Sequence, residues 1–287
     1  MCFLRSFNIL FRIIAVKFTN NFIDNYILIS YSKYMRAHKI IFFNQKGGVG
    51  KTTTCVNLGA ALGTMGYKVL LVDFDSQANL TGAVSGDGRK STIYQVVSGQ
   101  KSAIDAVQKT IFENLSLIAG SVDTAGLTVE LVDENEREFY LRHALRDLDD
   151  MFDYILLDCP PSIGLETMNA LAWADYVIIP LQCEYLAMEG LNLIMRTITN
   201  VKKSLNPELK IMGILFTMYS KRVLLNQDVV DDVSEYFKDL VFKTIIPRSV
   251  RLSEAPSHGM PINVYDKNNV GTKAYNALAK EVVERAW

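Results

Sequence analysis

The sequence is poor in the residues that build disulfide scaffolds and zinc sites. Its 287 residues include four cysteines, three histidines, seven prolines and two tryptophans. No two cysteines are spaced as a CxxC pair, and three histidines are too few to complete a ligand set with them. A zinc site or a disulfide framework is therefore not expected, and a reducing cytosol is the default compartment. The cysteines stand at positions 2, 55, 159 and 183.

The chain also lacks a dominant charge of one sign. Lysine and arginine total 30 and aspartate and glutamate total 31, which leaves a formal charge of −1. This balance excludes a histone-like polycation, but it permits a local basic surface that binds nucleic acid. A charged fraction of 21% and an aromatic fraction of 10% argue against global disorder. The length is sufficient for one large domain with a substantial core.

The first 34 residues lack the long apolar run of a membrane span. A spanning helix needs about 20 mostly apolar residues, whereas Arg5, Arg12 and Lys17 interrupt this stretch. No clean apolar core or small-residue cleavage site of a signal peptide is evident. An interfacial amphipathic helix is one interpretation of residues 1–34. The interpretation we favour is a disordered tail or a start-site artefact, with the natural start at Met35.

What the sequence does have, from residue 39 onward, is an alternation of short apolar runs and longer amphipathic stretches. Strands are predicted over 39–44, 68–75, 115–120, 153–160, 175–181, 210–217 and 240–247. Helices are predicted over 51–65, 136–149, 184–204, 223–238 and 271–286. Continuously apolar strands suit a parallel sheet that is covered on both faces. We therefore expect residues 35–287 to form a single α/β domain, with a mostly parallel twisted sheet between helices.

The most specific motif is the glycine-rich loop QKGGVGKTTT, which lies between a predicted strand and a predicted helix. Glycines 47, 48 and 50 let the backbone turn tightly and aim N–H groups at phosphate oxygens. The start of the following helix adds partial positive charge. Lys51 is placed to sit between the β- and γ-phosphates, and the Thr52 hydroxyl is placed to ligate Mg²⁺. The loop therefore predicts a P-loop NTPase.

The loop departs from the common phosphate-loop pattern, because Gln45 replaces the first glycine and Lys46 follows it. It also lacks a G-x-G-x-x-G fingerprint, which argues against a nicotinamide enzyme. With a lysine ahead of the glycines, KGGVGKTTT resembles the deviant Walker-A ATPases: ParA/Soj partition proteins, MinD and the nitrogenase iron protein. The resemblance covers about residues 36–287. It implies that Lys46 reaches across a dimer to the partner's nucleotide, where a second cation stabilises transition-state charge.

That resemblance implies a nucleotide site built mainly from one stretch of chain. Its phosphate-binding residues are expected to be Lys46, Gly47, Gly48, Val49, Gly50, Lys51, Thr52 and Thr53. Lys46 and Lys51 are also the cations expected to take part in catalysis, and the expected cofactors are ATP and Mg²⁺.

Two carboxylates stand at the end of the second predicted strand. Because Asp73 and Asp75 are two residues apart, they are expected to leave the strand on the same side. One could orient or deprotonate water, and the other could bind Mg²⁺ through water or brace Lys51. The segment resembles the D-x-D-P-Q-x-N stretch of ParA/Soj proteins, with Ser76 in place of proline. The resemblance makes Asp75 the hydrolytic carboxylate and part of the metal site, although the pair could instead cap a helix.

A third carboxylate, Asp158, ends the apolar strand within YILLDCPPS. An apolar strand that ends in aspartate is a weak signal by itself. Beside a phosphate loop it occupies the Walker-B position, where a carboxylate holds a Mg²⁺-bound water. The predicted metal set is thus Thr52, Asp75 and Asp158. Cys159 is expected to be a packing residue, because no His–Cys or Ser–His signature accompanies it.

The stretch TIIPRSVRLSEAPSHGMPI near the C-terminus also resembles the ParA/Soj signature. The resemblance implies that Pro247 and Ser249 frame the adenine, with Thr217 and Met218 completing the pocket. Relatives usually carry asparagine at the position of Ser249.

Several basic residues are candidates for DNA contact. Arg222 and Arg251 match the spaced arginines that carry nonspecific DNA binding in Soj-like relatives. Phosphate contact needs only a cluster of cations on one surface, with no base readout. Further candidates are Lys202, Lys203, Lys221 and Arg248.

The resemblance to ParA/Soj proteins implies a DNA-partitioning ATPase that acts in the cytoplasm on the nucleoid. ATP is expected to join two monomers into a sandwich dimer that binds DNA nonspecifically, and hydrolysis stimulated by a ParB-like partner is expected to release it. The alternative is a MinD-like membrane ATPase. Its C-terminal membrane helix is rich in basic residues, whereas the stretch 274–287 balances two cations with two glutamates. A metabolic kinase or ligase built on the same loop is a third possibility.

Overall fold

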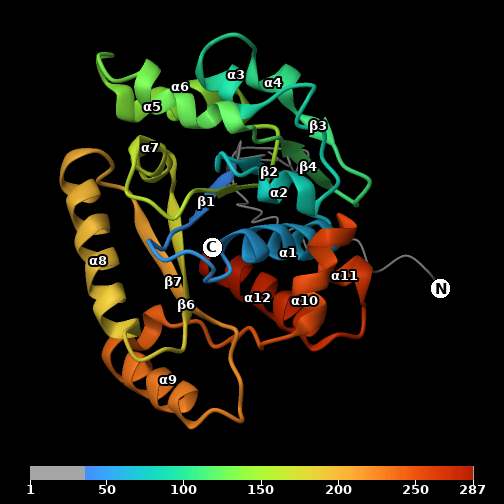
Figure 1. The fold of residues 1–287 in the computed structure, drawn as a ribbon, viewed down its shortest axis with the longest axis vertical. Helices are drawn as coiled ribbons and strands as arrows, with labels where there is room; N and C mark the ends of the chain where they lie inside the picture. The colour runs from blue at the N-terminus through green and yellow to red at the C-terminus, as the bar shows by residue number, and fades with distance from the viewer. Residues whose placement is uncertain (1–35, 287) are drawn as a thin grey trace, which may run out of the picture. The chain divides into compact units, whose positions relative to one another are not determined.

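The computed structural model describes residues 36–286 (Figure 1). The chain divides into residues 1–35 and a compact unit formed by the remainder. The extension predicted over 1–34 lies outside the described residues, so both interpretations of it stay predictions. Residues 36–286 form an α/β domain around one seven-stranded sheet. Among these residues, no helix combines the length and the apolarity that crossing a bilayer requires.

The sheet is parallel except at one edge. In spatial order its strands are β3 (Gln108–Lys109), β4 (Leu115–Ile118), β2 (Val69–Asp73), β5 (Tyr154–Asp158), β1 (His38–Phe42), β6 (Tyr176–Gln182) and β7 (Lys210–Thr217). Only the two-residue strand β3 runs antiparallel to its described neighbour. The prediction of a mostly parallel sheet is therefore confirmed.

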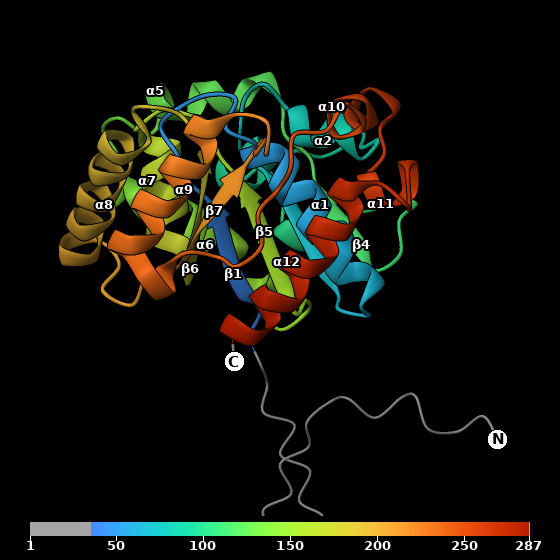
Figure 2. The same cartoon turned by 90° about the horizontal axis from the view of Figure 1, so that it is seen from below.

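Helices cover both faces of this sheet (Figure 2). One face carries α1 (Lys51–Thr64), α2 (Asn79–Ala83), α10 (Val250–Glu254), α11 (Ile262–Tyr265) and α12 (Val270–Ala286). The other carries α3 (Ile93–Val97), α4 (Ala103–Ala106), α5 (Leu127–Glu130), α6 (Tyr140–Leu145), α7 (Leu165–Trp173), α8 (Ala187–Ser204) and α9 (Leu224–Phe237). Short 3₁₀ segments are η1 (Val122–Gly126), η2 (Arg137–Phe139), η3 (Arg146–Leu148), η4 (Lys238–Leu240) and η5 (Ala255–His258).

The central strand β1 is continuously apolar over residues 40–42, where helices pack on both of its faces. Ile41 packs into the layer that holds α7 and α8, while its neighbours Ile40 and Phe42 pack into the layer that holds α1 and α12. Successive side chains of a strand point to opposite faces. Because both faces are covered by helices, every position of the strand's second half must be apolar.

The strand predicted over 240–247 is wrong. This segment meets β7 through one isolated bridge, between Val241 and Ile214, and through backbone hydrogen bonds from the N–H groups of residues 242 and 246. Between these two hydrogen bonds, the N–H groups of Lys243 and Thr244 donate to the Glu281 carboxylate at 2.8 and 3.0 Å. A side chain from α12 thus takes the hydrogen bonds that a strand ladder would need.

The single helix predicted over 136–149 is also wrong, because η2, α6 and η3 replace it. In a continuous helix the carbonyl of Arg137 would accept from the N–H of Leu141. Instead, the side-chain amide of Asn169 donates to that carbonyl at 2.8 Å and accepts from that N–H at 3.0 Å. Asn169 therefore interrupts the helix. The helices predicted over 51–65, 223–238 and 271–286 agree with the structure to within a residue at either end, and α8 begins three residues late.

Candidate nucleotide site

The glycine-rich loop lies at the carboxyl ends of the central strands. It joins β1 to α1, and the neighbours of β1 are β5 on one side and β6 on the other. The chain passes from β1 to β2 in one direction and from β5 to β6 in the other. Ligands of open α/β sheets bind at such a reversal, outside the carboxyl ends of the strands.

The glycines of the loop are required by its backbone. Gly48 and Gly50 have φ angles of +73° and +90°, which side chains with a Cβ rarely adopt. A Cβ added at Gly47 or Gly48 would meet nothing within 4 Å. Gly50 then caps α1 with no side-chain hydrogen bond. Open space therefore adjoins the start of a helix whose first N–H groups can bind an anion.

Side chains from three strand ends hold the loop in this shape. Thr217 Oγ1 donates to the carbonyl of Val49 at 2.8 Å, and Gln182 Nε2 donates to the carbonyl of Gly48 at 3.3 Å. Asn44 Oδ1 accepts the N–H two residues along the chain at 2.9 Å. The loop conformation is thus fixed by the fold as well as by its glycines.

Lys51 lies within this loop and is only 7% exposed. Its Nζ donates to the carbonyls of Asn44 at 3.1 Å and Lys46 at 3.2 Å. The ammonium group is therefore folded back against the loop, where phosphate oxygens would meet it.

Thr52 and Asp158 form a hydroxyl–carboxylate pair beside the loop. Thr52 Oγ1 donates to Asp158 Oδ2 at 2.5 Å. Asp158 is 1% exposed, and its Oδ1 has no partner within the described part of the chain. Burial, and secondarily the charge of Asp73, raises the pKa of Asp158 to about 8. A buried carboxylate oxygen without a partner, next to a hydroxyl, fits the hard oxygen set that Mg²⁺ prefers.

The two carboxylates at the carboxyl end of β2 have different surroundings. Asp73 is fully buried, and its Oδ2 accepts both the N–H and the Oγ1 of Thr81 at 2.8 and 2.7 Å. Burial raises the pKa of Asp73 to about 6, against the opposing effect of those hydrogen bonds. Asp75 is half-buried and accepts the N–H of Gln77 at 3.0 Å. Asp73 therefore holds the start of α2, which leaves Asp75 as the more accessible carboxylate.

Lys46 forms an ion pair with Glu184 of the same chain. Glu184 follows β6, so the pair joins the loop to a second strand end. The two side chains are 57% and 51% exposed. Such an exposed pair contributes little to stability and exchanges readily with other partners.

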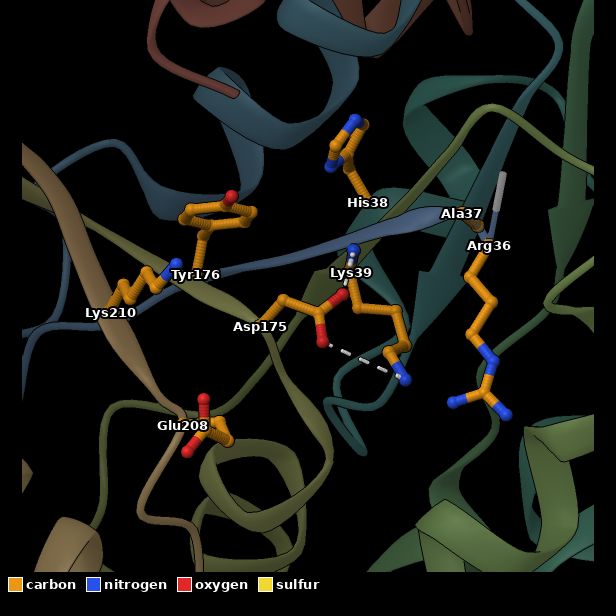
Figure 3. Close-up of a pocket in the computed structure, with 8 residues that line it drawn as sticks. All are labelled: Arg36, Ala37, His38, Lys39, Asp175, Tyr176, Glu208 and Lys210. Carbon is orange, nitrogen blue, oxygen red and sulfur yellow. Dashed lines mark hydrogen bonds and ion pairs between the residues drawn. The ribbon is translucent and has the colours of Figure 1, made fainter. Parts of the chain in front are cut away.

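A second pocket lies at the opposite end of the sheet (Figure 3). It has a volume of about 270 Å³ and surrounds the amino ends of β1, β6 and β7. Lys39 crosses it and forms ion pairs with Asp175 at 3.8 Å and Asp149 at 3.5 Å. None of the predicted site residues lines this pocket.

Comparison with known proteins identifies the family. A family model described as an AAA domain matches residues 37–211. The chromosome-partitioning ATPase Soj of Treponema pallidum (strain Nichols) is 51% identical over 246 residues, which cover 86% of this chain and 97% of that protein. The chain belongs to the ParA/Soj family of partitioning ATPases.

Two further proteins extend this comparison. The sporulation initiation inhibitor protein Soj of Bacillus subtilis (strain 168) is 48% identical over 245 residues, covering 85% of this chain and 97% of that protein. A crystal structure of cobyrinic acid a,c-diamide synthase from Mycobacterium smegmatis with a bound ATP analogue and magnesium superposes with a TM-score of 0.78. It shares 35% identity and covers 87% of this chain and 95% of that one.

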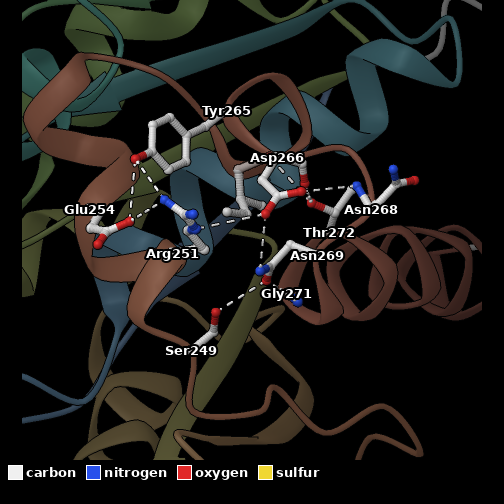
Figure 4. Close-up of polar contacts among 10 residues, drawn as sticks. Ser249, Arg251, Glu254, Tyr265, Asp266, Asn268, Asn269, Gly271 and Thr272 are labelled. Atoms are coloured by element: carbon white, nitrogen blue, oxygen red, sulfur yellow. Dashed lines mark hydrogen bonds and ion pairs between the residues drawn. The ribbon is translucent and has the colours of Figure 1, made fainter.

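The adenine residues predicted from the ParA/Soj signature come from two neighbouring segments. Tyr219 and Pro247 form an isolated bridge, which places Met218 beside the segment of Pro247. Met218 lines a cavity of about 340 Å³, and its Sδ accepts from Gln182 Nε2 at 2.7 Å. The Ser249 hydroxyl donates to Asn269 Oδ1 at 3.1 Å (Figure 4). Ser249 therefore directs its side chain toward the α11–α12 connection.

The predicted DNA-binding arginines lie on two different elements of this ParA/Soj fold. Arg222 is exposed in the turn before α9, and Arg251 is on α10. The segments before α9 and α10 adjoin, because Pro247 forms a bridge with Tyr219 and the N–H of Arg248 donates to the carbonyl of Tyr219 at 2.9 Å.

The sequence alone missed four residues that organise the site. Asn44, Gln182 and Glu184 follow or end parallel strands, and Thr81 lies near the start of α2. Polar residues at strand carboxyl ends were a usable signal, because those ends meet at one edge of a parallel sheet. Thr81 gave no such signal, since only the fold shows that its N–H and hydroxyl donate to Asp73.

Proposed function

We propose that this chain binds Mg·ATP at the loop and couples ATP hydrolysis to the partitioning of DNA. The observation that carries the proposal is the arrangement around α1. Lys51 is folded into an open glycine loop, and Thr52 is paired with the buried carboxylate of Asp158. The Treponema pallidum relative, which bears the partitioning name, is matched over 97% of its length.

The loop residues have separable tasks in this proposal. The N–H groups of the loop and of the first turn of α1 bind phosphate oxygens, and Lys51 places its charge between the β- and γ-phosphates. Thr52 and Asp158 would hold magnesium. When bound, magnesium neutralises charge that develops on the phosphate oxygens. Asp75 orients the attacking water from its half-buried position.

ATP-dependent dimerisation is supported by the surface beside Lys46. Tyr185 and Leu224 are each 84% exposed and Leu186 is 59% exposed. Asn226 Nδ2 donates to the carbonyl of Cys183, so the starts of α8 and α9 that carry these side chains adjoin. Neighbouring exposed apolar side chains are typical of an interaction surface. In the proposed dimer, Lys46 leaves Glu184 and reaches the nucleotide of the partner.

The dimer binds DNA through phosphates, using Arg222 and Arg251 from each copy. Doubling a few cations raises avidity without a permanently cationic protein. ATP and DNA binding then strengthen one another, because both favour the dimer. Hydrolysis, stimulated by a ParB-like partner on DNA, dissolves the dimer and frees it from the nucleoid.

A MinD-like membrane function is less compatible with α12. Its apolar residues Tyr275, Leu278, Ala279 and Val282 are all buried in the layer that contains α1. Arg285 and Glu281 pair with each other and with the backbone near β7. An apolar face that is already packed against the domain is not available for a lipid surface.

Co-sedimentation of the full chain tests the proposal. The chain is mixed with random-sequence duplex DNA or with anionic vesicles, in ATP, in ADP or without nucleotide. Binding to DNA only in ATP, lost in Lys51→Ala, is the expected result. Vesicle binding in ATP without DNA binding would support the membrane function instead. Nucleotide-independent behaviour would overturn both.

A further inference from the structure

Arg251 is held by acidic neighbours on its own chain (Figure 4). Its Nη1 donates to Glu254 Oε2 at 2.9 Å, and its Nε lies 4.0 Å from Asp266 Oδ2. The Tyr265 hydroxyl accepts from Nη1 at 3.5 Å and donates to Glu254 at 3.3 Å. Two carboxylates thus balance the charge of the guanidinium on the surface that is proposed to bind DNA.

Within this acidic pair, Glu254 and Asp266, the position of Asp266 is fixed by the fold. Asp266 Oδ1 accepts the N–H of Asn268 at 3.2 Å, and its Oδ2 accepts the side-chain amide of Asn269 at 3.5 Å. The side-chain oxygen Oδ1 of Asn269 in turn accepts the N–H of Gly271 at 2.8 Å. Asp266 therefore cannot easily swing away from Arg251.

The other proposed DNA arginine is in a different environment. Within residues 36–286, no acidic side chain forms an ion pair with Arg222, which is exposed. Arg251 is 55% exposed yet matched by the acidic pair. The hydrogen bonds that Arg251 donates to Tyr265 and to Glu254, in that order of size, raise its pKa. The two arginines thus carry the same charge, but only one has it locally neutralised.

We propose that Glu254 and Asp266 act as a brake on nonspecific DNA binding by competing with phosphate for Arg251. This inference rests on the proposed function, because it concerns the affinity of the same DNA surface. A phosphate that contacts Arg251 must replace these carboxylates and also approach their negative charge. The brake weakens each contact between Arg251 and a DNA phosphate. Dissociation of the dimer is then sufficient to release DNA.

The brake makes a quantitative prediction about the salt dependence of DNA affinity. Each additional phosphate contact steepens the dependence of log K on log salt by about 0.9 for duplex DNA. Removing one carboxylate should therefore tighten binding about twofold to fivefold, which is the range of a surface ion pair, and should steepen that slope.

The experiment measures fluorescence anisotropy of a labelled random-sequence duplex with the full chain in ATPγS, over a series of KCl concentrations. The variants are Glu254→Gln and Asp266→Asn, which keep side-chain shape and most hydrogen bonds. Asp133→Asn is the matched control, because it removes the same charge from an exposed position in the turn after α5, on the other side of the sheet from α10. Each variant is also made with Arg251→Ala. Unchanged ATPγS affinity and melting temperature show that the variants fold.

The expected result is tighter binding and a steeper salt slope for both variants, no change for Asp133→Asn, and no gain when Arg251 is alanine. Wild-type affinity in either variant, or a gain that persists with Arg251→Ala, would overturn the brake while leaving the proposed function intact. If the wild-type chain binds no DNA in ATPγS, the proposed function itself fails, and the brake fails with it.

Discussion

Asp73 and Asp158 lie opposite one another at the carboxyl ends of β2 and β5, paired in register. Both are buried, and each has one carboxylate oxygen without a partner among the described residues. Two buried carboxylates this close disfavour each other's ionisation. The site is therefore built to accept positive charge, from protons when no metal is present or from a cation when one is bound.

The first prediction concerns pH. The folded-state pKa values of Asp73 and Asp158 are raised from 3.8 to about 6 and about 8. A raised folded pKa means that the stabilising contribution is complete below the unfolded pKa and is lost as pH rises through the folded value. In EDTA, the free energy of unfolding should therefore fall through Asp73 between about pH 4 and pH 6 and through Asp158 between about pH 4 and pH 8, by up to about 1.4 kcal/mol per pH unit for each group in its own range.

Urea unfolding of wild type and Asp158→Asn at several pH values checks this. The difference between their free energies of unfolding should shift in favour of the variant as pH rises, because asparagine cannot ionise. Parallel curves for the two proteins would contradict the assignment of the pH dependence to Asp158.

The second prediction concerns Lys51. Lys51→Ala removes the only ammonium group that donates into the loop carbonyls among residues 36–286. Charge-assisted contacts of this kind are worth about 1.5–3 kcal/mol, so ATP affinity should fall about tenfold or more. Titration with a fluorescent ATP analogue measures the loss. Lys210→Ala, an exposed lysine at the amino end of β7, is the control and should bind the analogue normally.

The third prediction separates binding from hydrolysis. Asp75→Ala should bind ATP normally and hydrolyse it on the order of a hundredfold more slowly, since a positioned carboxylate no longer orients water. Its DNA complex in ATP should persist when that of the wild type decays. Phosphate release and the lifetime of the DNA complex are the two measurements. Rapid hydrolysis by the variant would exclude Asp75 as the water-orienting group.

The fourth prediction concerns packing around α1. A Cβ at Gly63 would lie 2.5 Å from the backbone carbonyl of Glu113, whereas a Cβ at Gly82 in α2 would meet nothing within 4 Å. Gly63→Ala should lower the free energy of unfolding by about 1–3 kcal/mol, because the backbone cannot yield cheaply. Gly82→Ala should change it by less than about 0.5 kcal/mol. Equal effects of the two variants in urea unfolding would show that the contact at Gly63 is not tight.

Much of the fold and the loop could be read from the sequence, since their causes are local. The second half of strand β1 is apolar because both its faces are covered there, and Lys51 follows the three glycines of a phosphate loop. The failures have nonlocal causes. Glu281 on α12 prevents a strand at 240–247, and Asn169 on α7 divides the helix expected at 136–149.

The residues of the site likewise divide into those that a local motif predicts and those that depend on distant parts of the chain. Thr52, Asp158 and Lys51 were predicted by motif and lie together at the start of α1. The partner of Lys46 is 138 residues away in sequence. One of the acids beside Arg251 is Asp266, which directly follows α11. No local pattern encodes such pairs, because they form only when the domain closes.

The three-point support of the phosphate loop by Asn44, Gln182 and Thr217 has a kinetic consequence. The loop loses its backbone conformational entropy when the domain folds. Nucleotide binding therefore does not incur that cost. Nucleotide capture is then a docking step without coupled folding, and its heat-capacity change should reflect only the surface that the base and sugar cover. The residence time of the product nucleotide is accordingly set by its contacts with the site, since the loop need not unfold for the nucleotide to dissociate.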